Sequence, residues 1–66
     1  MKIIVNGKET ECRDDMNLNE WLLENGYEKG KIAVEINESI LPKAKYAEYI
    51  LGPNDKLEIV SFVGGG

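Results

Sequence analysis

The dipeptide Asn6-Gly7 constrains the fold of this chain more than any other short segment. Both residue types tolerate the positive φ that a type I′ turn requires, and Asn-Gly is the strongest short-range hairpin signal. Segments rich in strand-forming residues flank the dipeptide, residues 2–5 before it and residues 8–13 after it. The sequence therefore predicts an N-terminal β-hairpin.

One amphipathic helix is predicted to follow the hairpin. Asn17 and Glu20 have the spacing of a capping box, with Asn at the position that Ser or Thr usually holds. Apolar residues recur at i, i+3 and i+4 from Leu18, and Gly26 is suited to end a helix. The pattern predicts a helix over residues 18–25 that lies across a sheet.

The second half of the chain predicts three more strands and a second short helix. The strands are expected at residues 31–37, 39–41 and 56–63, which are rich in β-branched and other apolar residues. Helical spacing from Tyr46 suggests the short helix over residues 44–51. This order of elements is typical of a small α+β domain with helices packed on a mixed sheet.

Size and charge exclude several classes of function. A chain of 66 residues forms one small domain, whose thin core leaves little room for an enclosed active site. The net charge of -4 repels phosphate backbones, so we expect no nucleic-acid partner. No apolar run approaches the ~18 residues that cross a membrane, so we expect no membrane partner either.

The chain also lacks most catalytic side chains. It contains no His and a single cysteine, Cys12, which excludes disulfides, His/Cys zinc sites and any imidazole base. Acidic neighbours do nothing to lower the pKa of that thiol, so we interpret it as a half-buried structural residue. We expect no catalytic residue and no metal site, and a lone thiol favours a cytoplasmic location.

The three glycines Gly64, Gly65 and Gly66 follow a strongly apolar strand. We expect residues 1–63 to form the domain and residues 64–66 to form a flexible tail, because glycine has the greatest backbone freedom. The Gly66 α-carboxylate is ionised at neutral pH. It could attack the α-phosphate of ATP and form an acyl-adenylate for a sulfur or nitrogen nucleophile. The residues alone leave open that the tail is only a frayed end or a cloning remnant.

The whole chain resembles the ThiS family, the small sulfur carriers of thiamine thiazole biosynthesis. The resemblance is carried by residues 2–8, 18–23, 33–37, 40–43, 55–60 and 63–66. It implies a ubiquitin-like β-grasp fold, with a mixed sheet of four to five strands and one main helix on one face. The chain departs from the family pattern with Lys43 for Arg, Tyr46 for Trp and Asn54 for Gly.

The resemblance implies a carrier that binds no cofactor of its own. Gly66 is expected to be adenylated by a ThiF-type adenylyltransferase, which consumes ATP, and then converted to a thiocarboxylate. A donor of the cysteine desulfurase type would supply the sulfur, and thiazole synthase ThiG would receive it. Gly65 and Gly64 would thread the active site of each partner. The resemblance implies that a glycine is required at Gly65, because a side chain there would clash with the channel walls. Two alternatives stay open, a ubiquitin-like modifier and a tail-inserting subunit like the small subunit of molybdopterin synthase.

Strand alternation predicts a docking surface. Leu57 and Ile59 share one face of the last strand, which we expect to meet the helix. Val60 and Phe62, with Ile4 of the first strand, then face away, where a one-sided sheet normally carries polar residues. Our hypothesis is that this patch docks the activating enzyme, and the alternative is scattered surface hydrophobic residues.

Overall fold

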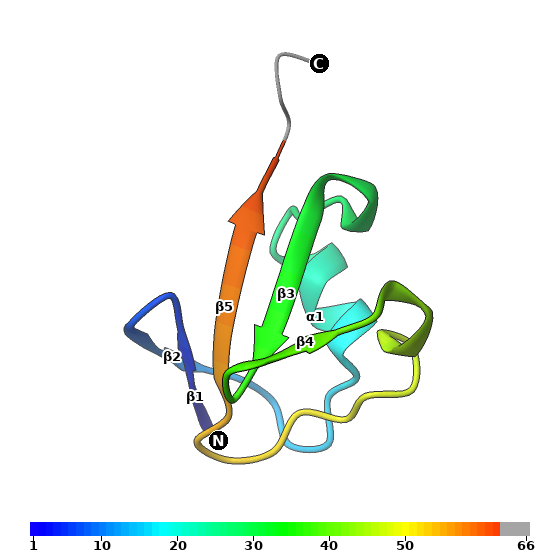
Figure 1. Ribbon diagram of the computed structural model, residues 1–66. Coiled ribbons are helices and arrows are strands. Elements are labelled where there is room, and N and C mark those ends of the chain that lie inside the picture. The colour runs from blue at the N-terminus through cyan, green and yellow to red at the C-terminus, as the bar shows by residue number, and fades with distance from the viewer. Residues whose placement is uncertain (63–66) are drawn as a thin grey trace.

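Five strands form a single mixed sheet in the computed structural model, which describes residues 1–62. The strands are β1 Lys2–Val5, β2 Lys8–Glu11, β3 Ile32–Ile36, β4 Ser39–Leu41 and β5 Lys56–Ser61. Their order is β2-β1-β5-β3-β4 (Figure 1). Only the β1–β5 pair is parallel among these strands. The last strand of the chain therefore lies in the centre of the sheet.

The N-terminal hairpin is confirmed, and its turn residues have positive φ, 50° at Asn6 and 83° at Gly7. The second strand is shorter than predicted and ends at Glu11, because the chain leaves the sheet for a turn in which Asp15 has a φ of 58°. The Asn6 side chain also binds the central strand. Its Oδ1 accepts a hydrogen bond from the Ile59 N–H at 2.7 Å, and its Nδ2 donates to the Ile59 carbonyl at 3.3 Å.

Helix α1 spans Leu18–Glu24 and covers one face of the sheet (Figure 1). The predicted cap is present, since Asn17 Oδ1 accepts from the Glu20 N–H at 3.2 Å. Gly26, with a φ of 81°, follows the C-terminal cap residue Asn25. The helix thus begins where the sequence predicts and ends one residue earlier, with its apolar stripe buried against the sheet.

The predicted second helix is present only as a single 3₁₀ turn, η2, at Lys43–Lys45. The prediction of a helix through residue 51 was wrong. Residues 49–51 instead run antiparallel to the segment that enters α1: the Leu18 N–H donates to the Tyr49 carbonyl and the Leu51 N–H donates to the Met16 carbonyl, both at 2.8 Å. These long-range hydrogen bonds replace the ones that a continued helix would form. A second 3₁₀ turn, η1 at Lys29–Lys31, precedes β3.

The core lies between the sheet and the layer formed by α1 and the segment after η2. The side chains that are at most 8% exposed are Ile3, Cys12, Met16, Leu18, Trp21, Leu22, Ile32, Val34, Ile36, Tyr46, Leu51, Leu57 and Ile59. Strands β3 and β5 are shorter than the predicted ranges 31–37 and 56–63. The architecture is the expected α+β ubiquitin-like β-grasp. No helix within residues 1–62 has the length and apolar character needed to cross a membrane.

Candidate functional site

The strand that leads to the glycine run is held on both sides. Strand β5 pairs with β1 through Lys56 and Leu57, and with β3 through five residue pairs. The Phe62 N–H donates to the Lys31 carbonyl at 3.0 Å, which extends the pairing one residue past β5. The chain is therefore fixed up to Phe62, and four further residues reach at most about 13–14 Å when extended.

The predicted sulfur-carrying residue Gly66, and the threading residues Gly65 and Gly64, lie outside the described residues. So does Val63, the last residue of the predicted domain. The expected boundary between domain and tail therefore stays a prediction, as do the roles of the three glycines.

Lys43, which stands where the family pattern has Arg, lies beside the end of β5. Its Nζ donates to the Ile32 carbonyl at 2.5 Å and sits 5.3 Å from the centroid of the Phe62 ring and 5.9 Å from that of Tyr46. An ammonium at these distances from two aromatic faces is attracted by their electrons. Lys43 thus contacts Phe62 within the chain and links it to the start of β3.

The predicted docking residues are not all neighbours. Val60 and Phe62 face away from α1, with exposed fractions of 58% and 54%. Ile4 shares that side of the sheet, but its partner on β5 is Lys56, four residues before Val60. At about 3.3 Å per residue, this separation is about 13 Å along the strand. The structure therefore separates Ile4 from the other two.

Ile40 is an outward-facing residue that sequence reasoning missed. It is 75% exposed and lies opposite Glu35, which in turn lies opposite Glu58 of β5. Alternation in the sequence puts Ile40 and Leu41 on opposite faces, and the packing of Leu41 against the core in the structure turns Ile40 outward. We use the name outer sheet face for the group Ala33, Glu35, Ile40, Glu58, Val60 and Phe62. No described element crosses this face (Figure 1).

Two glutamates lie opposite each other on the outer sheet face. Glu35 and Glu58 are direct cross-strand partners, and both are half-buried. Within residues 1–62 neither of them forms an ion pair, because the neighbouring Lys56 contacts Glu38 at 3.6 Å instead. Like charges placed directly opposite each other destabilise a sheet. We therefore expect the pair to lower the stability of the folded domain.

A hydrogen-bond network holds the loop before β5. The Asp55 carboxylate accepts from the Tyr49 hydroxyl and the Gly52 N–H, both at 2.8 Å, and from the Asn37 amide at 3.0 Å. Burial acts to raise the pKa of Asp55, but the three hydrogen bonds outweigh it and lower the pKa. Burial and the neighbouring carboxylate raise the pKa of Tyr49 to about 12. Every member is engaged within the fold, so the network serves structure.

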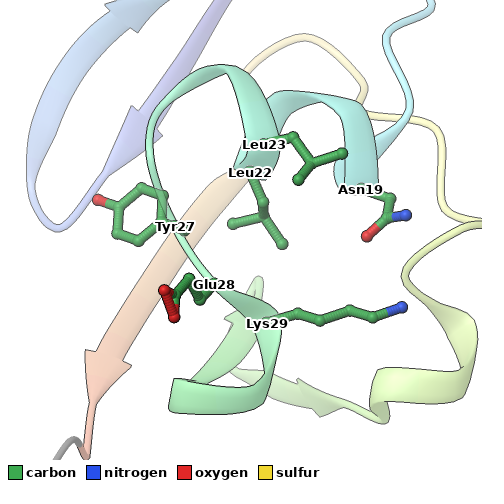
Figure 2. A pocket seen from close by; sticks show the side chains of 6 residues that line it. All are labelled: Asn19, Leu22, Leu23, Tyr27, Glu28 and Lys29. Atoms are coloured by element: carbon green, nitrogen blue, oxygen red, sulfur yellow. The ribbon is translucent and has the colours of Figure 1, made fainter.

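Other features offer little chemistry. Burial raises the pKa of the Cys12 thiol, so the thiol stays protonated and unreactive at neutral pH. Within residues 1–62, no group of three His, Cys, Asp or Glu residues is placed to hold a metal ion. Figure 2 shows a depression beside α1, lined by Asn19, Leu22, Leu23, Tyr27, Glu28 and Lys29. These side chains do not make a nucleophile–base pair.

Comparisons with known proteins identify the family. The ThiS family model matches residues 3–66. The chain belongs to the ThiS family. It is 40% identical over 63 residues to the sulfur carrier protein ThiS of Bacillus subtilis, an alignment that covers 94% of this chain and 96% of that protein. A crystal structure of the thiamine biosynthesis protein ThiS from Geobacter metallireducens matches with a TM-score of 0.83 at 26% identity, with all of both chains covered.

A second kind of relative is much longer. The chain is 44% identical to a thiazole synthase of Paramagnetospirillum magneticum over 66 residues, which are all of this chain and 20% of that enzyme. A thiazole synthase of Magnetococcus marinus matches over the same shares at 33% identity. The chain thus spans about a fifth of the length of these two relatives. A ThiS-like segment therefore occurs within proteins named as thiazole synthases.

Proposed function

We propose that this chain is a sulfur carrier for thiamine thiazole synthesis, with the Gly66 carboxylate as the group that carries sulfur. The observation that supports this most is the family match, which extends through residue 66 and so includes the glycine run. A relative named as a sulfur carrier matches over nearly its whole length. The carrier is a substrate of other enzymes, in keeping with the scarcity of catalytic side chains in its sequence.

The proposed loading takes two steps. First, the Gly66 carboxylate oxygen attacks the α-phosphate of ATP, so that an acyl-adenylate forms and pyrophosphate leaves. Second, a sulfur nucleophile attacks the acyl carbon and AMP leaves with the bond electrons. A hydrosulfide loses its proton to give the thiocarboxylate directly, and a persulfide gives it after a thiol reduces the S–S bond. Both steps occur on partner enzymes, and ATP is consumed there rather than bound by this chain.

The geometry of β5 suits this role. A central strand, paired on both sides, gives the glycine run a rigid base, so that docking the domain also positions the tail. Glycines lack a Cβ and therefore fit a channel too narrow for other residues. Gly64 and Gly65 are proposed to occupy such a channel while Gly66 reaches the reacting phosphate or sulfur.

Three partner enzymes complete the proposal: a ThiF-type adenylyltransferase, a sulfur donor of the cysteine desulfurase type, and thiazole synthase ThiG as acceptor. The thiazole synthases that contain a matching segment support the last of these. We place all of them in the cytoplasm. Val60 and Phe62 are proposed to dock the adenylyltransferase. Ile4 is proposed to form a separate contact with this enzyme, because its partner on β5 is Lys56, four residues before Val60.

The test is the mass of the protein purified from its own cells without reductant or acid. Cleavage after Lys56 releases residues 57–66, a peptide that contains neither Met nor Cys. A gain equal to the difference between sulfur and oxygen in this peptide therefore reports on Gly66 and not on methionine oxidation. We expect that gain, and we expect an alkylating agent to label the same peptide.

A variant that carries one extra residue after Gly66 is the matched control. It should fold like the wild type and show no mass gain, because its carboxylate no longer meets the reacting groups. Only the unmodified peptide, persisting after incubation with ATP, a sulfide source and cell extract, would overturn the proposal. Conjugates joined to lysines of other proteins would instead indicate the ubiquitin-like modifier.

A further inference from the structure

The outer sheet face combines exposed apolar side chains with an unusual charge arrangement. Ile40, Val60 and Phe62 are each more than half exposed on this face. Ile40 shares its cross-strand row with Glu35 and Glu58, two half-buried glutamates opposite each other on neighbouring strands, and Val60 lies in the next outward-facing row. Side chains opposite each other in a sheet have Cβ atoms about 4.5–5.5 Å apart, so we expect the two like charges to repel each other.

No Lys or Arg side chain within residues 1–62 neutralises the Glu35–Glu58 pair. Five of the eight Lys and Arg side chains contact other carboxylates, in the pairs Lys2–Glu9, Arg13–Glu24, Lys31–Glu28, Lys45–Glu48 and Lys56–Glu38. Lys43 donates to the Ile32 carbonyl, and Lys29 lines the depression of Figure 2. Lys8 lies on β2, opposite Val5. Within residues 1–62 the carboxylate pair thus forms no ion pair.

We infer that a cationic side chain of the adenylating partner, best an arginine, inserts between Glu35 and Glu58 when the outer sheet face docks. This inference rests on the proposed function and specifies the chemistry of its first partner. A guanidinium presents five donors in a planar fork, so it can bind two carboxylates at once, which an ammonium does less well. The apolar side chains Ile40, opposite Glu35, and Val60, in the next outward-facing row, would exclude water around that contact, which strengthens it.

The Glu35–Glu58 pair is expected to have opposite effects on the stability of the free domain and on the affinity of the complex. In the free domain the Glu35–Glu58 repulsion lowers stability, and the partner cation converts the same pair into an attraction. Removal of one charge should therefore stabilise the free carrier and weaken the complex. A residue with a purely structural role would change both properties in the same direction. This opposition of signs is the signature to measure.

The experiment uses Glu58→Gln, which keeps size and shape but removes the charge. Adenylation is measured as ATP–pyrophosphate exchange by the ThiF-type enzyme of the same cell, with the carrier as the varied substrate. We expect the KM for the carrier to rise about tenfold or more while kcat is unchanged, because a desolvated charge contact is lost. The Tm of the free carrier should rise by a few degrees. Glu35→Gln should behave in the same way.

Glu9→Gln is the matched control. Glu9 lies on the same side of the sheet, opposite Ile4, but already contacts Lys2 at 3.4 Å and is 72% exposed. We expect its KM to equal that of the wild type. The KM of the wild type should also rise more steeply with salt than that of Glu58→Gln.

The outcomes separate the two proposals. A wild-type carrier that supports no exchange overturns the proposed function. Exchange with the wild type, together with an unchanged KM for both Glu58→Gln and Glu35→Gln, overturns the docking inference alone. A lowered Tm in the two variants also overturns it, since the pair would then stabilise the free domain.

Discussion

The two faces of strand β5 differ sharply although they alternate along the same six residues. Leu57 and Ile59 on the inner face are 0% and 8% exposed, whereas Val60 on the outer face is 58% exposed. Both faces carry apolar side chains, so hydrophobicity alone does not distinguish them. The faces differ in whether other segments pack on them: α1 and the segment after η2 lie over the inner face only (Figure 1). The inner face is used for folding, and the outer one is the face that we propose for a partner.

Charge distinguishes the faces as well. Within residues 1–62 no polar or charged side chain is buried in the core, whereas the outer sheet face holds the opposed Glu35 and Glu58. A small domain has little stability to lose. It can carry an uncompensated pair only where solvent still reaches the charges, and the half-buried state of Glu35 and Glu58 meets that condition.

The largest expected loss of stability comes from a substitution on the inner face of β5. Leu57→Ala removes a fully buried side chain beside the core residues of α1 and β3. We expect the free energy of unfolding to fall by about 2–5 kcal/mol, enough to unfold much of so small a domain. Urea denaturation followed by circular dichroism measures the change.

Val60→Ala is the control on the same strand, three residues away and on the opposite face. Its loss should stay within about 0.5 kcal/mol, because the side chain is mostly exposed. Equal losses for the two variants would contradict the division of β5 into a folding face and a free face.

A smaller effect is expected at the loop that leads into β5. Asp55→Ala leaves the Tyr49 hydroxyl, the Gly52 N–H and the Asn37 amide without their shared acceptor. We expect a loss of about 1–3 kcal/mol, measured by urea denaturation at neutral pH. Tyr49→Phe, which removes only one of the three contacts, should lose less.

The pH dependence of this loss follows from the lowered pKa of Asp55. A carboxyl with a lower pKa in the folded state binds fewer protons there than in the unfolded chain. Its contribution is therefore present above the ordinary aspartate pKa of about 3.9 and is lost as pH falls through the lowered value. The difference in stability between wild type and Asp55→Ala should shrink over that acidic range. A difference that grows toward acid would contradict the assignment.

The smallest expected loss of stability concerns α1, the helix that packs on the inner face. Asn17→Ala removes the N-cap of α1 and the hydrogen bond from Asn17 Nδ2 to the Ala47 carbonyl. We expect a loss of about 0.5–2 kcal/mol in the free energy of unfolding. Asn19→Ala, inside the same helix, is the control and should stabilise or leave the domain unchanged, because alanine has the higher helix propensity. A larger loss for Asn19→Ala would show that the cap does not hold α1.

Local signals in the sequence were sufficient for much of the fold. The Asn6-Gly7 turn, the Asn17 cap and the alternation along β5 each depend on residues within a few positions of one another, and the structure confirms all three. The same kind of signal failed over residues 44–51. There, helical spacing from Tyr46 competes with hydrogen bonds to residues 16–18, some thirty positions away.

The candidate site shows the same limit. The sequence by itself determined which residues of β5 face outward, that imidazole chemistry is excluded, and that a glycine run follows the last strand. Only the tertiary structure decided that Ile4 lies apart from Val60, that Ile40 joins the outer sheet face, and that Glu35 meets Glu58. The physical reason is register. Side-chain alternation is set within a strand, whereas the choice of opposite residues depends on how distant segments jointly bury their apolar faces.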